Sequence, residues 1–293
     1  MSKIICTGSA GFIGSNLVDK LIELKHDVIV LDNLSTGKKE NINSKARFIN
    51  CDIKDSEAIK PYFKNIDYVF HLAARARVQP SIEDPVRAHN DNVNGTLNIL
   101  WASKEANVKK VIFSSSSSVY GENYLPLLET FKPNPQSPYA LQKYIGELYC
   151  RMFSSLYKLP TVCLRYFNVW GMRQSNEGAY ALVIAKFLRQ KKEGKPMTIT
   201  GDGKQTRDFC HVSDVVNANI LAMEKDIGNG EVINIGGGNN VSVNKIAKLI
   251  GGEIKHIKSR LEPHDTLADI RKAKRLLGWS PLTNIEKGIK LLK

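Results

Sequence analysis

The chain reads KIICTGSAGFIG from Lys3 to Gly14, where an apolar run meets a helical pattern across three glycines. Glycine allows a tight turn, lets the backbone approach a pyrophosphate and permits close packing of a helix on a strand. The start of a helix also offers free N–H groups and the positive end of its dipole to phosphate oxygens. Plain turns use glycine too, but the strand before and the helix after favour a dinucleotide-binding turn. Its GxxGxxG spacing differs from the commoner GxGxxG.

Outward from this turn, short apolar runs alternate with helical patterns through the first half of the chain. The runs are rich in Val, Ile and Phe and mostly lack polar alternation, which is typical of parallel strands buried on both faces. This order predicts right-handed βαβ units in a doubly wound α/β sheet. The predicted strands are Lys3–Thr7, Asp27–Leu31, Arg47–Cys51, Tyr68–Leu72, Val111–Ser115 and Thr161–Tyr166. The predicted helices are Phe12–Leu24, Val93–Ala106 and Tyr139–Tyr157.

The second half of the chain is less regular and predicts a smaller α/β lobe on the carboxyl edge of the sheet, where ligands of open α/β sheets bind. We expect residues 1–167, with about 207–235, to form a nucleotide-binding domain, and 168–206 with 236–293 to form the smaller lobe. The predicted elements are a helix over Ala179–Lys192, a strand pair near Met197–Thr200, a helix over Val212–Met223, strands at Val232–Ile235 and near Glu253–Ile257, and basic helices at the end.

The composition excludes several classes of protein. The 293 residues are 42% hydrophobic and 24% charged, which suits a globular protein with a sizeable core. No apolar run is long enough for a membrane span, and the N-terminus lacks the pattern of a secretory signal. The five cysteines and six histidines are scattered, with no CxxC pair and no cluster of metal ligands. We therefore expect a cytoplasmic protein with no metal and no membrane partner.

The formal net charge of +13 is compatible with a nucleic acid, an anionic membrane or a small anionic ligand as partner. From Lys245 to the end there are 12 basic and 5 acidic residues, so +7 of the excess lies in the last segment. Basic residues are not interleaved with aromatics there, which speaks against nucleic acid. We expect weak steering of a small anion and, for most of these lysines, a solvated surface.

Acidic residues follow the second and third predicted strands. Asp32 lies about 20 residues beyond the glycines, where a carboxylate accepts adenosine ribose hydroxyls and repels a 2′-phosphate, which favours NAD over NADP. An Asx turn with Asn33 is the alternative for Asp32. Asp52 is predicted to contact the adenine, with a helix N-cap as a nearly equal alternative.

The stretch Tyr139-Ala140-Leu141-Gln142-Lys143 opens the long central helix and places Tyr139 and Lys143 on one face. A free phenol is a poor base at neutral pH, and a nearby cation lowers its pKa. About 20 residues earlier, five serines (Ser114–Ser118) end a buried strand and ordered residues resume at once. A serine hydroxyl there can bind a substrate hydroxyl while its proton moves to the tyrosine. Unrelated surface residues and a flexible serine loop are the alternatives.

As a set, these motifs resemble the extended short-chain dehydrogenase/reductase superfamily, and within it the nucleotide-sugar 4-epimerases. The resemblance covers nearly the whole chain. Its motifs are TGSAGFIGSNL, VLDNLSTG, CDI, VFHLAA, DNVNGTLNIL, SSSSVYG, SPYALQK, RYFNVWG, TRDFCHV and ADIRKAKRLLGW. It implies Ser116, Tyr139 and Lys143 as the catalytic set and NAD as the cofactor.

The resemblance also implies binding residues and a partner. The cofactor-binding residues it implies are Gly8, Gly11, Phe12, Ile13, Gly14, Asp32, Asn33, Asp52, Ile53, Leu72, Ala73, Ala74, Asn92, Tyr139, Lys143 and Tyr166, with His71 packed behind the cofactor. The substrate-binding residues it implies are Ser116, Asn168, Thr198, Thr200, Arg207, Arg260 and Thr266, of which Arg207 and Arg260 would clamp the diphosphate. A homodimer through a four-helix bundle of Val93–Ala106 and Tyr139–Tyr157 is implied as well.

The implied reaction inverts C4 of a UDP-hexose. Tyr139 takes the proton of the 4-hydroxyl, the C4 hydride goes to NAD⁺, and it returns to the other face of the 4-keto sugar. A small residue at Thr266 would leave room for a 2-acetamido group, so UDP-GlcNAc/UDP-GalNAc are expected beside UDP-Glc/UDP-Gal.

Three alternatives remain open. The 4,6-dehydratases of the superfamily have a threonine, an aspartate and a glutamate where this chain has Ser116, Ser117 and Ser118. UDP-glucuronate decarboxylases usually keep the glutamate. The missing carboxylates speak against both, and the intact catalytic set speaks against an inactive dinucleotide sensor.

Overall fold

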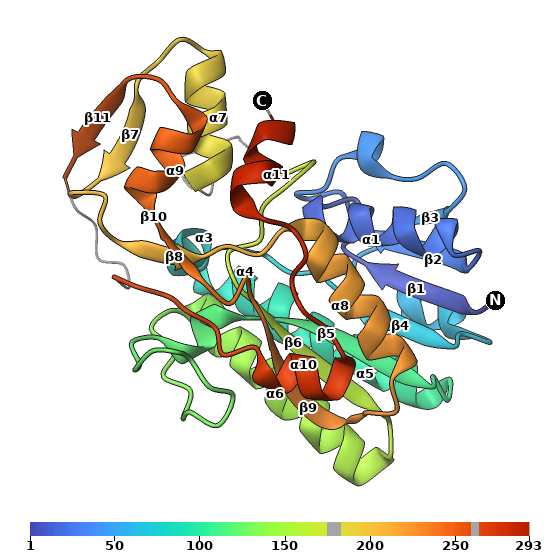
Figure 1. The fold of residues 1–293 in the computed structure, drawn as a ribbon. Helices are drawn as coiled ribbons and strands as arrows, with labels where there is room; N and C mark the ends of the chain where they lie inside the picture. The colour runs from blue at the N-terminus through green and yellow to red at the C-terminus, as the bar shows by residue number, and fades with distance from the viewer. Residues whose placement is uncertain (175–182, 259–263, 293) are drawn as a thin grey trace.

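A parallel sheet of seven strands forms the centre of the computed structural model (Figure 1). The structure describes residues 1–174, 183–258 and 264–292. The strands are ordered β3-β2-β1-β4-β5-β6-β9 across the sheet. The chain adds β2 and β3 on one side of β1 and the later strands on its other side, as in dinucleotide-binding doubly wound folds. The strands are β1 (Lys3–Thr7), β2 (Asp27–Asp32), β3 (Arg47–Asn50), β4 (Tyr68–His71), β5 (Lys110–Ser116), β6 (Thr161–Tyr166) and β9 (Asn229–Ile235). The predicted fold class is confirmed.

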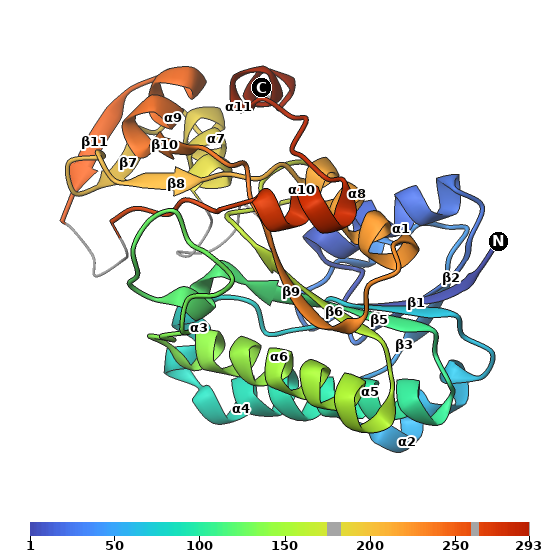
Figure 2. The ribbon, with the colours of Figure 1, turned by 60° about the horizontal axis from the view of Figure 1, so that its bottom comes forward.

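Helices cover both faces of the sheet, each over its own apolar core (Figure 2). One face is covered by α1 (Phe12–Glu23), α8 (Val212–Glu224) and α10 (Arg271–Leu277). The other face is covered by α2 (Ser56–Ile59), α4 (Pro85–His89), α5 (Gly95–Glu105) and α6 (Pro138–Tyr157), with α3 (Val78–Glu83) packed against α6. Among the described residues, no helix combines the length and apolarity that crossing a membrane requires.

The smaller lobe is built by the segments that leave the carboxyl ends of β6 and β9, and it has a separate apolar core. Strand β8 (Thr206–Asp208) pairs antiparallel with β10 (Asn240–Ser242), and β7 (Met197–Thr200) pairs parallel with β11 (Ile254–Ile257). Its helices are α7 (Val183–Lys192), α9 (Val243–Ile250) and α11 (Ile285–Leu291). Figure 1 shows this lobe beside the sheet, joined to it by several crossings of the chain.

The expected helix over Val93–Ala106 corresponds to α5, whose first predicted residues belong to the π-helical turn Asn90–Asn94 that precedes it without a break. One detail of the predicted elements is wrong. The strand at Met197–Thr200 does not pair locally, since its partner β11 lies more than fifty residues later. The expected helix from Ala179 is described from Val183 onward, and its first residues lie outside the described part of the chain.

The long helix α6 is held in place at both ends. The Ser137 hydroxyl accepts a hydrogen bond from the Ala140 backbone N–H, and Pro138 occupies the first turn, where its missing donor costs nothing. The helix ends at Tyr157, and the next residue, Lys158, caps it in the left-handed conformation (φ 57°). Between its ends, Gly146 lies against the ring of Phe113 on β5, where a Cβ atom would overlap the ring. This close approach brings the start of α6 to the carboxyl end of β5.

Candidate active site

The glycine turn is sterically specified and leaves hydrogen-bond donors free. Gly8 has φ +69°, and a Cβ atom there would lie 2.5 Å from the backbone N and Cα of Ala73. Helix α1 begins after Gly11 with no side chain capping its first N–H groups, so the N–H groups at Phe12 and Ile13 face outward. The buried Ser9 hydroxyl, beside Gly14, also has no partner. Uncapped donors and a cradle too tight for a side chain fit a bound diphosphate.

The carboxyl end of β2 fixes the predicted ribose site. Asp32 is buried, and its two carboxylate oxygens accept hydrogen bonds from the backbone N–H groups of Ala10 (2.8 Å) and Leu34 (2.8 Å). The contact with Leu34 is the Asx turn that the sequence offered as the alternative to ribose binding. The Asp32 carboxylate keeps further lone pairs, so it can form this turn and also accept from ribose hydroxyls. Asp32 thereby ties the glycine turn to β2.

Asp52 lies beside Asn33, whose amide donates to its carboxylate at 3.1 Å. The N-cap alternative for Asp52 is wrong, because Asp55 caps α2 by accepting from the Ala58 N–H. Burial raises the pKa of Asp52, but hydrogen bonds from Lys54 and Asn33 outweigh burial and lower it overall. The neighbouring Ile53 is buried and lies where a Cβ atom on Gly95 would be.

Residues after β4 line the other side of the glycine turn. The Leu72 and Ala73 N–H groups donate to the backbone oxygen and the hydroxyl of Thr7, both at 3.2 Å, and Ala74 follows them. His71 is fully buried between Thr7 (2.7 Å) and Thr96 (2.9 Å). Burial, with a smaller effect of Lys143, lowers the pKa of His71 to about 3, so the ring is neutral. The His71 ring packs between β1 and α5.

Two predicted cofactor residues are already bonded within the protein. The Asn92 amide accepts from the Arg75 N–H (2.7 Å) and donates to Gln142 on α6 (2.8 Å). The Tyr166 hydroxyl donates to Asn219 on α8 (2.9 Å) and contacts Ser114. Their polar groups position the surrounding elements, and direct contact of either with a cofactor stays a prediction.

Ser116, Tyr139 and Lys143 are brought together by the carboxyl end of β5 and the first two turns of α6. Tyr139 hydrogen-bonds Ser116, and the Lys143 ammonium lies 6.0 Å from the centre of the tyrosine ring. Lys143 donates to the Ser114 backbone oxygen at 2.7 Å. The Ser118 hydroxyl donates to Ser116 at 2.9 Å, which leaves the Ser116 proton for the bond to Tyr139.

The pKa values at this centre differ from the simple expectation from the spacing. Burial raises the pKa of Tyr139, and the hydrogen bond from Ser116 opposes it only in part. Burial also lowers the pKa of Lys143 to about 8, while Cys150 and Glu147 favour its charged form. The lysine alone therefore does not make the phenol a ready base. A further positive charge close to the ring would favour the phenolate.

Two of the predicted substrate residues meet at the edge of the smaller lobe. The Asn168 amide donates to the Asp208 backbone oxygen (2.9 Å) and contacts the Thr266 hydroxyl (3.3 Å). The same hydroxyl accepts from the Asp208 N–H at 3.1 Å. The Asp208 carboxylate in turn accepts from the backbone N–H groups of Gly237, Gly238 and Ala268. Asp208 thus fixes both predicted residues, and sequence reasoning missed it, although it stands beside Arg207.

The other predicted substrate residues are less closely gathered. Arg207 lies on β8 and donates to the backbone oxygens of Thr206 (2.9 Å) and His264 (3.0 Å). Thr198 and Thr200 share the less buried face of β7, and the Thr198 hydroxyl accepts from Gln190. Arg260 lies outside the described residues.

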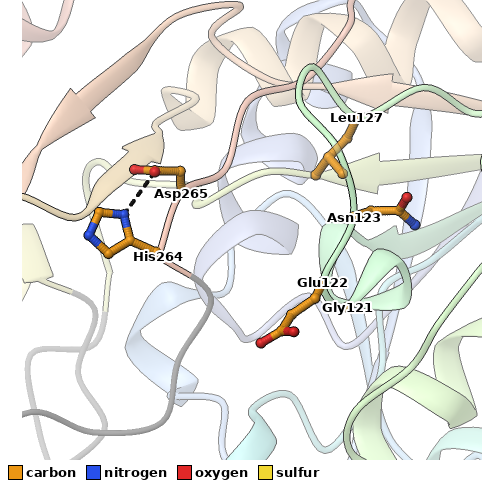
Figure 3. A pocket seen from close by; sticks show the side chains of 6 residues that line it. All are labelled: Gly121, Glu122, Asn123, Leu127, His264 and Asp265. Atoms are coloured by element: carbon orange, nitrogen blue, oxygen red, sulfur yellow. Dashed lines mark hydrogen bonds and ion pairs between the residues drawn. The ribbon is translucent and has the colours of Figure 1, made fainter.

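A hollow of about 240 Å³ is lined by Gly121, Glu122, Asn123, Leu127, His264 and Asp265 (Figure 3). One wall is the loop from Gly121 to Leu127, and the other contains His264 and Asp265, joined by a 2.8 Å hydrogen bond. Asp265 also accepts from the Thr206 backbone N–H at 3.0 Å. Sequence reasoning missed this hollow, because its walls lie far apart in the sequence. The one available signal in the sequence was that Asp265 directly precedes Thr266, which was predicted to bind substrate.

A family model described as the NAD dependent epimerase/dehydratase family matches residues 4–236. The chain belongs to this family. The uncapped glycine turn and the Ser116–Tyr139–Lys143 cluster both lie within the matched residues.

Solved structures of this family share the whole fold. The UDP-glucose 4-epimerase of Thermotoga maritima, solved with UDP-glucose, is 44% identical with a TM-score of 0.95, covering 99% of this chain and 96% of that one. A UDP-N-acetylglucosamine 4-epimerase of Methanobrevibacter ruminantium, in complex with UDP-N-acetylmuramic acid, is 39% identical with a TM-score of 0.95, again covering 99% and 96%. By sequence comparison, the UDP-glucose 4-epimerase of Mycolicibacterium smegmatis is 37% identical over 98% of this chain and 96% of its own. The predictions of superfamily, fold, NAD dependence and isomerase class are confirmed.

Proposed function

We propose that this member of the epimerase/dehydratase family inverts C4 of a UDP-hexose. The observation that supports the proposal best is the reaction centre itself, where Ser116, Tyr139 and Lys143 converge with no carboxylate at Ser117 or Ser118. Dehydration and decarboxylation would need further acid–base groups there. Relatives named as epimerases of UDP-glucose and of UDP-N-acetylglucosamine support the same conclusion.

Each residue of the centre has a separate task. Tyr139 removes the proton of the sugar 4-hydroxyl and returns it after inversion, while Ser116 binds the same oxygen. NAD supplies the hydride acceptor and donor at C4, and its oxidised ring is positively charged. Lys143, held by Ser114, favours the phenolate through its charge.

We propose that residues 1–167, with about 207–235, bind NAD and that 168–206 with 236–293 bind the UDP-sugar. Asn168 and Arg207 would hold the diphosphate, since amide and guanidinium donors suit phosphate oxygens. The half-buried Thr266 and the adjoining hollow leave room for a 2-acetamido group, so UDP-GlcNAc/UDP-GalNAc would be accepted beside UDP-Glc/UDP-Gal.

Product analysis tests this function. The purified protein is incubated with a panel of UDP-sugars without added NADH, and products are separated by chromatography and mass spectrometry. We expect a 4-epimer of unchanged mass from a UDP-hexose. Relatives include a UDP-glucuronate 4-epimerase and a UDP-glucuronic acid decarboxylase, at 36% and 33% identity. A product of lower mass would show elimination or decarboxylation and contradict the proposal.

Tyr139→Phe tests the base. It removes one hydroxyl from a buried ring, so we expect kcat to fall by about 10²–10⁴-fold while NAD stays bound. Tyr144→Phe, five residues further along α6, is the matched control and is expected to retain activity. Undiminished turnover by Tyr139→Phe would show that another group is the base.

We also propose that the protein forms a homodimer through α5 and α6. Apolar side chains on the outer faces of these helices are exposed, which include Trp101, Leu148 and Leu156 at 46%, 42% and 65%. Such a patch is typical of an interface. Leu148→Asp should give a monomer in sedimentation velocity, where wild type should sediment as a dimer. A monomeric wild type would refute the proposal.

A further inference from the structure

Three successive residues of β5 contact three turns of α6. The Ser114 backbone oxygen accepts from Lys143, the Ser115 hydroxyl donates to Glu147 at 2.5 Å, and Ser116 bonds Tyr139. Residues 139, 143 and 147 are spaced by four, so they form one face of the helix. Two of the three contacts belong to the reaction centre. The third, at Glu147, has no role in the reaction proposed above.

Glu147 is one half of a buried ion pair with Arg165 on β6. The two side chains are 2% and 3% exposed, and the guanidinium donates twice to the carboxylate, at 2.8 and 2.6 Å. This bidentate geometry is the strong form of the interaction. Burying two charges costs much of what their attraction returns, so such a pair is weak evidence for a purely stabilising role.

The pair continues as a network toward the substrate end of the site. The Arg165 guanidinium lies 4.5 Å from the ring centre of Tyr120, whose hydroxyl donates to Asn234 at 2.7 Å. The Asn234 amide donates to the Leu127 backbone oxygen at 2.8 Å, in the loop that lines the hollow. Glu147 therefore connects the catalytic helix, two central strands and the loop beside the proposed sugar site.

We propose that Glu147 is a positioning residue that holds α6 in register on β5 and keeps Lys143 charged. The proposal rests on the function proposed above. The Glu147 carboxylate fixes the helix one turn after Lys143, so that Tyr139 meets Ser116 and Lys143 meets Ser114. A shift of about 1 Å at such a centre costs on the order of 100-fold in rate.

The charges around Lys143 agree with the second task. Burial lowers its pKa to about 8, and Cys150 and Glu147 raise it. The titratable or charged groups facing this cluster are His71 on β4, Tyr139, Glu147 and Cys150 on α6, and Cys163 and Arg165 on β6. His71 is neutral, and both cysteines are buried and not in disulfides. Glu147, one turn from Lys143 on the same helix face, is the carboxylate that favours the lysine ammonium.

Glu147→Gln tests the proposal, because it keeps the volume and an acceptor for Ser115 but removes the charge. We expect kcat to fall by about 10- to 100-fold with KM for the UDP-hexose and bound NAD little changed. The alkaline limb of the kcat–pH profile should move to lower pH by about one unit, since Lys143 loses its proton earlier. Glu286→Gln removes the carboxylate of the exposed Lys245–Glu286 pair (2.9 Å) and should change neither quantity.

A double variant separates positioning from stability. Glu147→Gln leaves a buried Arg165 without its partner, which is destabilising in itself. Glu147→Gln/Arg165→Met removes both charges, so its melting temperature should return toward wild type while kcat stays well below it. Full recovery of kcat and of the pH profile in the double variant would overturn the proposal.

One readout needs no turnover. A ¹⁵N NMR titration of the Lys143 ammonium in the NAD-bound protein, assigned with Lys143→Arg, measures its pKa directly. We expect a lower value in Glu147→Gln than in wild type, and equal values would refute the charge role. A wild type that converts no UDP-hexose would refute the proposed function, but this titration would still decide for or against Glu147.

Discussion

At the cofactor end of the site, side chains come from the ends of neighbouring strands in one parallel sheet, whereas at the substrate end they come from short segments far apart in the sequence. Thr7 and His71 are register partners on β1 and β4, and Ser116 ends β5 beside them. By contrast, Thr206 meets Asp265 and Leu127 meets Ala268 through isolated bridges. Under the proposed function, the sheet would hold the residues of the reaction and the short pairings would set the choice of substrate.

Gly8→Ala should show the larger effect, at the cofactor end. A Cβ atom there would overlap the Ala73 backbone, and positive φ adds about 1–3 kcal/mol of strain. We expect NAD affinity to fall by at least about 100-fold, measured by calorimetry on the apoprotein.

Gly278→Ala is the matched control for the glycine turn. Gly278 also has φ +69°, but a Cβ atom there meets nothing within 4 Å. It should cost about 1 kcal/mol of stability and leave NAD affinity unchanged. Equal NAD affinity in the two variants would show that the tight approach of Gly8 to Ala73 is not what forms the cofactor site.

Thr266→Tyr should have a selective effect, at the substrate end. A large ring beside Asn168 would fill space proposed for the 2-acetamido group, so kcat/KM for UDP-GlcNAc should fall at least about tenfold. The value for UDP-Glc should change little, and Thr266→Ser, which keeps the hydroxyl used by Asp208, should resemble wild type. Equal losses of kcat/KM on UDP-GlcNAc and UDP-Glc would contradict the proposal that Thr266 selects between the two sugars.

His71 should have the smallest effect, on stability alone. Its folded pKa of about 3 lies below the ordinary 6.5, so the unfolded chain binds the extra proton between these values. The free energy of unfolding should therefore fall as pH drops from 6.5 toward 3, by at most about 1.4 kcal/mol per pH unit from this group. His71→Asn should be less stable at neutral pH and show a shallower slope in denaturant titrations. If His71→Asn left the pH slope of the free energy of unfolding unchanged, the His71 ring would be solvated in the folded protein, against this account.

The parallel sheet and the reaction centre could be predicted from sequence because they depend on local patterns. Buried strands appear as apolar runs, and the four-residue spacing of Tyr139 and Lys143 places them on one helix face. Asp208 and Asp265 could not be found in this way. Their importance arises from contacts with Ala268 and Thr206, about sixty residues away, which no local pattern encodes. The raised pKa of Tyr139 also required the structure, since burial is a property of the whole fold.

The most direct test of the account uses UDP-glucose carrying deuterium at C4, with no added NADH. Hydride removal and return at one carbon within the site predicts UDP-galactose that keeps the deuterium at C4, with no exchange into solvent, and far slower product formation by Tyr139→Phe. Loss of the label to water, or a product of lower mass, would contradict the account, because the hydrogen would then have left C4 by another route.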